Sequence, residues 1–406
     1  MHEYIFVLGR YPELSTEEIL AVAKRENLSL SIIDKSSDFL VVQSPSPLDL
    51  SHLNSQLGGT VKIGTILSHM PLALDTTKLE DYLTSDSLFT DILHVDNDKV
   101  TFGISYYSVP GSTPFFTKQT IARLLKLIKH HLELQSFKAR FPNHQDLSLS
   151  SASVEKNKLL TSGAEILLVQ TKTELLVGKT VAVQEFEAFS QRDYGRPMRD
   201  MDSGIMPPKI ARMMLNLTEI SHQDPILDPF CGSGTILQEA MLLGFTHITG
   251  TDSSGKAVTD SQTNNNWLRS KFNLENKPSV SKVDVRSLSE TFPEQKFAAI
   301  VTEPYMGPNL QQRQSLPEIQ KIRLELRDLY LTALQQFFAI LRPQGVIVMV
   351  LPIFHAANQY LPMEILSDAG RIGLQQIPLS QKRRQTLIVG NNRDFVLREI
   401  VKFVRQ

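Results

Sequence analysis

The sequence predicts an α/β protein with a doubly wound, mostly parallel sheet in its C-terminal half and smaller α+β units ahead of it. From residue 225 onwards, strand-like apolar runs alternate with helical patterns across short connections, as in a parallel sheet covered by helices. Residues 385–389 and 395–403 read as a hairpin, so the last strands are expected to be antiparallel. Two smaller groups of strands and helices precede this region, within residues 1–185.

Length and composition limit the class of protein. The chain has 406 residues, more than one ordinary domain of about 100–200 residues holds. Its 41% apolar and 21% charged residues are typical of globular domains. A single cysteine, Cys231, excludes a disulfide framework and multi-cysteine metal sites. With no apolar run near ~18 residues and no signal-peptide pattern, we expect a cytoplasmic protein that does not span a membrane.

Charge is distributed unevenly, although the formal net charge is only −1. Residues 1–117 hold 7 Lys/Arg against 15 Asp/Glu, whereas residues 118–180 hold 10 against 5 and residues 371–406 hold 8 against 2. Local basic segments on a neutral chain are compatible with a confined nucleic-acid footprint, but solvated helix faces also cause them.

The first predicted domain covers residues 1–68. Strands are expected at 4–8, 31–33, 39–43 and 61–67, with a helix from about residue 48. Ser15 and Glu18 have the spacing of a capping box and predict a helix that runs to about Arg25. The segment carries no paired carboxylates and no phosphate loop, so we expect a scaffold module.

The second predicted domain covers residues 69–185, with strands at 100–106, 165–170 and 174–183 and a helix at 118–133. Apolar residues of this helix recur at the spacing of one buried face. Basic side chains remain towards water there and continue just beyond the helix. The candidate RNA-binding residues are Lys118, Arg123, Lys126, Lys129, Lys138 and Arg140.

Residues 186–215 are predicted to be a linker and a lead-in helix. The linker is polar and rich in turn formers, from Arg192 to Arg199. Met206 is followed by two prolines and Lys209, and proline is favoured in the first turn of a helix. The third predicted domain follows, over residues 216–406.

A glycine-rich loop, D-P-F-C-G-S-G-T, lies at the first strand-to-helix turn of this domain. Asp228 argues against a pyrophosphate, which it would repel, and for a cationic cofactor; the third glycine of the dinucleotide fingerprint is also missing. S-adenosylmethionine (SAM) carries an ammonium and a sulfonium group. The string resembles the first motif of amino-methylating enzymes that act on nucleic acids. The expected cofactor contacts here are Asp228, Phe230, Gly232, Gly234 and Thr235.

Two further aspartates end the next two predicted strands. Asp252 stands where an acidic residue meets a cofactor's ribose hydroxyls in this type of sheet. Asp284 and Val285 end the third strand, and the resemblance implies that this aspartate accepts a hydrogen bond from the adenine amino group.

The candidate catalytic residues end the fourth strand, in T-E-P-Y-M-G at residues 302–307. The string resembles the D/N-P-P-Y/F/W motif of amino methylases, in which a side-chain oxygen and a backbone carbonyl accept the hydrogens of a base amine while the aromatic ring stacks on the base. It departs from that motif, because Glu303 replaces the shorter acid and one proline is missing. We interpret Glu303 and Pro304 as the acceptors and Tyr305 as the stacking residue.

Residues 153–350 together resemble the tRNA guanine-N2 methyltransferases that act at position 10. In that family a ferredoxin-like domain and a THUMP RNA-binding domain precede a Rossmann-like class I methyltransferase domain with an antiparallel final hairpin. The THUMP resemblance rests on residues 154–166. The family resemblance as a whole implies SAM as the cofactor and tRNA as the partner. The number of methyl groups added and the need for a small activating protein stay open.

Two other hypotheses remain. An rRNA guanine-N2 methylase or a DNA adenine-N6/cytosine-N4 methylase would share the catalytic motifs, although a DNA enzyme is expected to carry a target-recognition insertion. A non-catalytic SAM- and RNA-binding protein is a different class. The intact Asp228, Gly232, Gly234 and Asp252 weigh against it.

Overall fold

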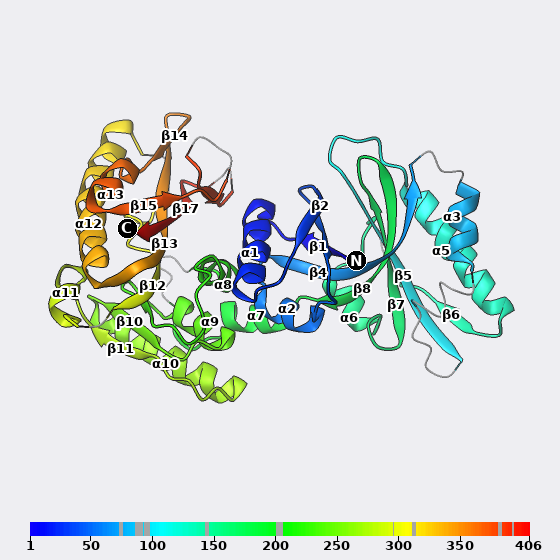
Figure 1. Ribbon diagram of the computed structural model, residues 1–406, viewed down its shortest axis with the longest axis horizontal. Coiled ribbons are helices and arrows are strands. Elements are labelled where there is room, and N and C mark those ends of the chain that lie inside the picture. The colour runs from blue at the N-terminus through cyan, green and yellow to red at the C-terminus, as the bar shows by residue number, and fades with distance from the viewer. Residues whose placement is uncertain are drawn as a thin grey trace. The chain divides into compact units, whose positions relative to one another are not determined.

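A computed structural model describes residues 1–72, 76–85, 92, 98–142, 146–199, 206–294, 296–310, 314–380, 384–391 and 394–406. The chain divides into two structural units (Figure 1). Unit 1 comprises Met1–Thr16 and Asn27–Phe186, and unit 2 comprises Glu17–Glu26 and Glu187–Gln406. None of the helices in the described ranges combines the length and apolar character that crossing a membrane requires.

Unit 1 is built on one eight-stranded sheet with the order β2-β3-β1-β4-β8-β7-β5-β6. Its pairs are antiparallel except that β5 runs parallel to both β6 and β7. The strands are β1 (His2–Leu8), β2 (Ser31–Lys35), β3 (Phe39–Ser44), β4 (Thr60–Pro71), β5 (Lys99–Ser108), β6 (Lys138–Arg140), β7 (Gly163–Gln170) and β8 (Glu174–Val183).

The predicted boundary at residue 68 falls inside β4. The first half of this strand pairs with β1, and the strand from Lys62 to Pro71 pairs with β8. The two predicted N-terminal domains therefore share one continuous sheet in the structure. The strand predicted at residues 61–67 is longer in the structure, from Thr60 to Pro71.

Helix α5 (Lys118–Leu134) buries the face that its periodicity predicts. Ile121, Leu124 and Ile128 are each 2% exposed or less, and they pack in one cluster with the strand residues Phe102 and Ile104. Helix α3 (Thr76–Leu83) contacts α5 (Figure 1). The remaining helices of this region are α2 (Leu50–Gln56) and α6 (Ser151–Lys156).

The capping box predicted at Ser15 and Glu18 is wrong. Helix α1 (Pro12–Arg25) begins earlier, at a proline, whose missing N–H costs nothing in a first turn. Ser15 is therefore inside the helix, and its Oγ donates to the carbonyl oxygens of Tyr11 and Gly59 at 2.9 Å each. Glu18 is fully buried.

Unit 2 contains a nine-stranded sheet with the main order β11-β10-β9-β12-β13-β17-β15. Neighbours from β11 to β13 are parallel, whereas β17 is antiparallel to β13, β15 and β16, which confirms the predicted sheet with its final hairpin. The strands are β9 (Ile226–Asp228), β10 (Ile248–Asp252), β11 (Ser279–Lys282), β12 (Phe297–Thr302), β13 (Leu341–Ala356), β14 (Gln359–Pro362), β15 (Leu374–Ile377), β16 (Leu387–Val389) and β17 (Val396–Arg405).

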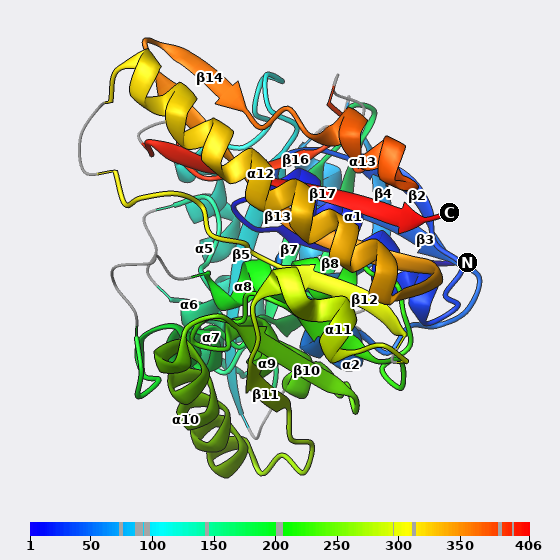
Figure 2. The same ribbon diagram turned by 90° about the vertical axis from the view of Figure 1, so that its left-hand side faces the viewer.

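Helices cover both faces of this sheet. Figure 1 shows α12 and α13 on one side and α8 and α9 on the other, and α12 runs across the strands in Figure 2. Tyr330 and Phe337 of α12 are fully buried against the sheet. The helices are α8 (Pro208–Asn216), α9 (Thr235–Leu243), α10 (Gly255–Phe272), α11 (Leu288–Thr291), α12 (Leu316–Ile340) and α13 (Leu366–Ile372).

The segment predicted as linker and lead-in helix holds a second helix, α7 (Phe186–Tyr194), ahead of α8. Its buried residues are one aromatic and one charged side chain, Phe189 and Arg192, which do not form the apolar stripe that predicts a helix. Arg192 of α7 and Arg212 of α8 both pair with Glu239 of α9, at 2.6 and 2.8 Å. The Arg192 guanidinium also lies 4.2 Å from the centre of the Phe189 ring.

Candidate active site

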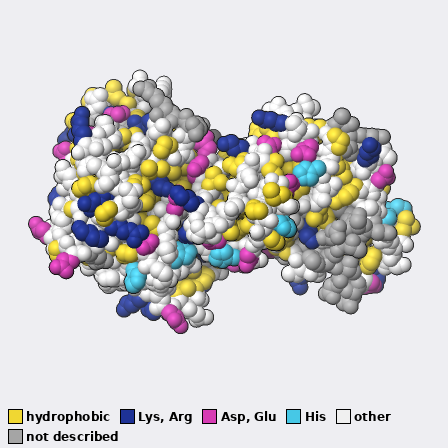
Figure 3. All heavy atoms as spheres, viewed as in Figure 1, with side chains coloured by type: hydrophobic (Ala, Val, Ile, Leu, Met, Phe, Trp, Pro, Cys, Tyr) yellow, Lys and Arg dark blue, Asp and Glu magenta, His cyan; other side chains and the backbone are white. Residues whose placement is uncertain are grey.

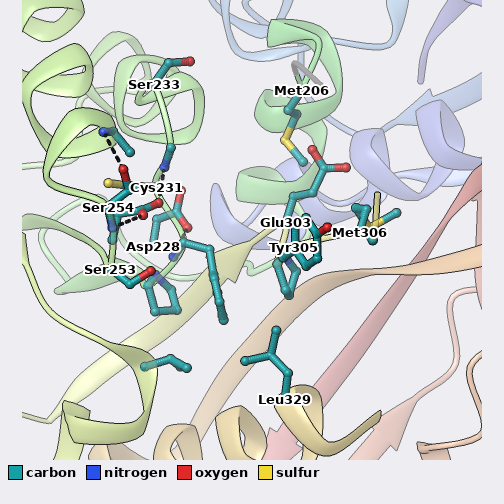
Figure 4. A pocket seen from close by; sticks show the side chains of 18 of the residues that line it. Met206, Asp228, Cys231, Ser233, Ser253, Ser254, Glu303, Tyr305, Met306 and Leu329 are labelled. Atoms are coloured by element: carbon teal, nitrogen blue, oxygen red, sulfur yellow. Dashed lines mark hydrogen bonds between the residues drawn. The ribbon is translucent and has the colours of Figure 1, made fainter. Parts of the chain in front are cut away.

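A cavity of about 880 Å³ opens at the carboxyl edge of the unit 2 sheet. Its walls come from the segments that follow β9, β10, β11 and β12, together with the start of β17. Parallel strands place their carboxyl ends at one edge, where ligands bind in sheets of this type. Figure 4 shows Asp228, Cys231, Ser233 and Ser254 on one side of the cavity and Glu303, Tyr305 and Met306 across from them.

The glycine-rich loop turns from β9 into α9 through two left-handed residues. Gly232 has φ = 49° and Gly234 has φ = 88°, a region that glycine adopts without steric cost. A side chain at Gly234 would place its Cβ 2.6 Å from the Ser261 Oγ of α10. Of the predicted cofactor contacts in this loop, Gly232 and Thr235 line the cavity, whereas Gly234 does not. Its position serves the turn and the packing of α9 against α10.

Asp228 is 2% exposed and ends β9 at the cavity wall. Thr302 Oγ1 and the Phe230 N–H donate to Asp228 Oδ1 at 2.8 and 3.2 Å. Burial raises the pKa of Asp228 to about 7, against the effect of these hydrogen bonds, and the nearby Asp252 and Glu303 add to the rise. A buried carboxyl group of this kind favours a cationic ligand, because the cation would stabilise its ionised form.

Asp252 connects the first two strand-to-helix turns. Its Oδ2 accepts from the Gly232 N–H at 3.0 Å, and its Oδ1 accepts from the Ser254 N–H at 2.9 Å. Each carboxylate oxygen can accept further hydrogen bonds, so the side chain can hold the loop and still bind a pair of hydroxyl groups in the cavity.

Asp284 and Val285 line the cavity as well, beyond β11. Asp284 caps the short helix Val285–Ser287 by accepting from the Arg286 N–H at 2.9 Å. Its carboxylate also contacts Arg286 Nη1 at 3.1 Å. Sequence reasoning missed Arg286, which partly neutralises the aspartate at the cavity rim.

The Glu303 side chain forms an ion pair that the sequence did not indicate. Arg398 of β17 contacts it with Nε 2.5 Å from Oε1 and Nη2 3.5 Å from Oε2. Both residues line the cavity. Arg398 stands far along the chain from Glu303. It is one of four charged residues in β17, with Glu399, Lys402 and Arg405, and its position in the sequence does not mark it as the partner of Glu303.

The loop after Glu303 presents an aromatic ring. Tyr305 is 54% exposed, and its carbonyl oxygen accepts from the hydroxyl of the buried Tyr330 at 2.7 Å. Gly307 turns the chain with φ = 94°. Tyr330 of α12 therefore holds the Tyr305 backbone while the Tyr305 ring stays accessible to a ligand. Pro304 lies in the cavity wall beside Glu303.

Arg196 lies behind the glycine-rich loop and is 3% exposed. Its Nη1 donates to Thr235 Oγ1 at 2.6 Å, and burial lowers the pKa of this guanidinium below its usual range. The Thr235 hydroxyl at the start of α9 is thus oriented by a residue from the segment predicted as linker.

Cys231 is buried, and this burial raises the pKa of its thiol far above the usual range. A thiol in that state is a poor nucleophile. Within the part of the chain that the structure describes, no cluster of three or more His, Cys, Asp or Glu side chains could hold a metal ion.

The six candidate RNA-binding residues lie in unit 1, on α5 and β6, outside this cavity. Four of them face acidic neighbours: Arg123 pairs with Glu80, Lys138 with Asp98, Lys129 with Glu133 and Lys118 with Asp146. The Arg140 Nε donates to Thr101 Oγ1 at 2.9 Å. Figure 3 shows basic and acidic side chains interspersed at the end of unit 1 that carries α3 and α5.

Comparison with known proteins identifies the kind of domain that carries the cavity. Residues 196–360 match the UPF0020 family, described as an RMKL-like methyltransferase domain. The chain is 26% identical over 313 residues to a tRNA (guanine(10)-N2)-dimethyltransferase of Methanothermobacter thermautotrophicus, covering 76% of this chain and 78% of the relative. It is also 26% identical over 349 residues to the protein of the same name from Pyrococcus abyssi, covering 83% and 85%.

Solved structures extend the likeness to the whole chain. TrmN from Thermus thermophilus superposes with a TM-score of 0.58 over 100% of both chains, at 13% identity. SMU.472, a putative methyltransferase complexed with SAH, gives a TM-score of 0.50 over 100% of this chain and 98% of its own, at 12% identity. These similarities show a Rossmann-like methyltransferase fold for unit 2.

Proposed function

We propose that this protein, whose residues 196–360 form a methyltransferase domain of the UPF0020 family, transfers a methyl group from SAM to the exocyclic N2 amine of guanosine 10 in tRNA. The observation that carries the proposal is the meeting of Asp228, Asp252 and Glu303 in one cavity. The relatives named tRNA (guanine(10)-N2)-dimethyltransferases support the substrate.

The donor groups of the cavity fit SAM. Asp228 offers a buried carboxyl group to a cation, and Asp252 offers two oxygens to a ribose. Phe230, Gly232, Thr235 and Val285 also line the cavity, as does Asp284, which we assign to the adenine amino group. When bound, SAM supplies an electrophilic methyl group on a sulfonium centre.

Glu303 and Pro304 are the groups that we assign to the guanine amine. The lone pair of this amine is delocalised into the ring, so the nitrogen is a poor nucleophile. A Glu303 carboxylate oxygen and the Pro304 carbonyl would accept its two hydrogens and localise the lone pair. Since the Tyr305 carbonyl already accepts from Tyr330, Pro304 is the better candidate for the second acceptor. The exposed Tyr305 ring is suited to stack on a base rotated out of its helix.

Unit 1, which spans the predicted ferredoxin-like and THUMP domains, would bind the rest of the tRNA, with Lys126 and Arg140 as exposed contacts on α5 and β6. The paired lysines and arginines can exchange their acidic partners for phosphates, although each exchange costs the ion pair it breaks. A tRNA substrate is consistent with action in the cytoplasm. A small activating protein remains a further candidate partner.

Mass spectrometry of nucleosides from tRNA treated with protein and SAM tests this proposal. N2-methylguanosine or its dimethyl form is expected, and the ratio of the two reports how many methyl groups are added. N6-methyladenosine, or methylation of DNA or rRNA in place of tRNA, would support the alternative substrates. Absence of transfer with SAM binding retained would support a binding protein.

A further inference from the structure

The acid of the catalytic loop is one methylene longer than the aspartate of the motif it resembles, and it is tied to a strand two places away in the sheet. Glu303 follows β12, β13 is the next strand, and Arg398 lies on β17 beyond it. In the ladder between β13 and β17, Arg398 pairs with Pro352. Because Pro352 lies inside β13, which continues to Ala356, the arginine side chain crosses β13 to reach Glu303.

The contact is close on one carboxylate oxygen and loose on the other. Arg398 Nε lies 2.5 Å from Glu303 Oε1, whereas Nη2 lies 3.5 Å from Oε2. The side chains are 27% and 14% exposed, so solvent screens the pair only in part. Oε1 is committed to the arginine. Oε2 remains the better acceptor for a hydrogen-bond donor in the cavity.

Other basic side chains that line the cavity pair with acidic residues other than Glu303. Lys256 pairs with Asp260, and Arg286 pairs with Asp284. Among the cavity residues that the structure describes, Arg398 is the cation in contact with Glu303. Glu303 also lies close enough to Asp228 to raise the pKa of that buried acid. Without the guanidinium, two carboxyl groups would repel each other across the site.

We propose that Arg398 is a positioning residue for methyl transfer: it holds the long Glu303 side chain in one orientation, so that Oε2 is directed at the guanine amine. The proposal rests on the proposed function. It explains how a glutamate can stand in a loop that resembles a motif with a shorter acid, because the ion pair restricts the additional rotatable bond of the longer side chain.

A double-mutant cycle with Arg398→Gln and Glu303→Gln tests the proposal on the full-length protein and tRNA. Arg398→Gln should lower kcat by about tenfold or more while leaving KM for tRNA and the SAM dissociation constant within about threefold. Arg398→Lys, which keeps the charge but loses the planar fork, should restore part of kcat. The double variant should be no slower than Glu303→Gln alone, because Arg398 acts through Glu303.

Arg405→Gln is the matched control. Arg405 lies on the same strand but outside the cavity, over the Phe338 ring, so its replacement should leave kcat unchanged. Thermal unfolding and SAM calorimetry of each variant separate loss of fold from loss of positioning. If Arg398→Gln does not fold, Arg398→Lys and its combination with Glu303→Gln complete the cycle.

Three results would overturn the proposal. The first is a wild-type kcat in Arg398→Gln. The second is a double variant in which the effects of Arg398→Gln and Glu303→Gln on kcat multiply, because the two residues would then act independently. The third is an effect of Arg398→Gln that is confined to KM for tRNA, which would make Arg398 a phosphate contact. Failure of the wild-type protein to methylate tRNA would instead contradict the proposed function, and the cycle would then be measured on the substrate that it does methylate.

Discussion

Thr302, the last residue of β12, donates a hydrogen bond of 2.8 Å from its Oγ1 to Asp228 Oδ1, at the end of β9. This bond joins the two motifs that the sequence places far apart. Asp228 begins the proposed cofactor loop, and Thr302 immediately precedes Glu303. The proposed methyl donor and acceptor sites therefore share one rigid edge of the sheet.

SAM affinity is expected to rise with pH through about 7. Burial raises the pKa of Asp228 to about 7, and a bound cation favours the ionised carboxylate. Below that pH, binding must expel a proton, so affinity should fall by up to about tenfold per pH unit. Calorimetry between pH 5.5 and 8.5 measures this dependence. Asp228→Asn should bind more weakly at high pH and show a flat profile. A flat profile in the wild type would exclude Asp228 as the group that meets the cation.

Replacement of Asp252 by Ala should weaken SAM binding by about 1.5–3 kcal/mol, the scale for loss of charge-assisted hydrogen bonds to a hydroxyl pair. Part of this loss would come from the loop, because Asp252 also accepts from Gly232 and Ser254. Asp252→Asn keeps one oxygen acceptor and should lose less. Since Asp252 lies in the cavity of unit 2, tRNA binding measured by filter retention should hardly change. An equal loss of both affinities would make Asp252 a structural residue.

The predicted RNA surface can be tested by salt dependence. For double-stranded regions, a variant that no longer neutralises one phosphate should have a slope of log affinity against log salt that is shallower by about 0.9. Lys126→Ala combined with Arg140→Ala should make the slope shallower by about 0.9 for each residue, with SAM affinity preserved. Lys35→Ala, on the exposed strand β2, is the control and should leave the slope unchanged. A slope near zero in the wild type would remove α5 and β6 from the RNA interface.

Apolar periodicity predicted most elements of the fold, because burial of one face is a local property of a sequence. The five buried residues of α5 and the order of β and α elements after residue 225 follow from it. Helix α7 was missed because its buried residues are a single aromatic, Phe189, and a charged side chain, Arg192, which pairs with Glu239. The boundary at residue 68 was misplaced because pairing of β4 with β8 joins distant segments.

In the site too, residues of local motifs could be predicted from the sequence, whereas contacts between distant residues could not. Asp228, Gly232 and Asp252 belong to local motifs and were predicted to lie together, and the structure places all three in the cavity. Arg398 reaches Glu303 only through the order of β12, β13 and β17. Likewise, the pairing of Arg123 with Glu80 depends on the packing of α3 against α5. Such contacts between distant residues have no signature in a single sequence.

Replacements at Glu303 and Tyr305 test the assigned catalytic roles. Turnover should fall in the order wild type, Glu303→Gln, Glu303→Ala, with the alanine variant slower by about 100-fold or more. Tyr305→Phe should keep most activity, whereas Tyr305→Ala should lose about 1–3 kcal/mol of stacking. Single-turnover rates and separate SAM and tRNA affinities are the measurements. Equal damage from Phe and Ala at 305 would make the hydroxyl the important group, and a fully active Glu303→Ala would transfer the acceptor role elsewhere.

The most direct test of the central claim uses two tRNA transcripts that differ by one exocyclic group. Inosine at position 10 lacks the N2 amine of guanosine and keeps the rest of the base. Nucleoside mass spectrometry with mapping of the modified position should find N2-methylated guanosine at position 10 of the guanosine transcript and no methyl transfer to the inosine transcript. Equal methylation of both transcripts would show that the enzyme methylates another atom or another position.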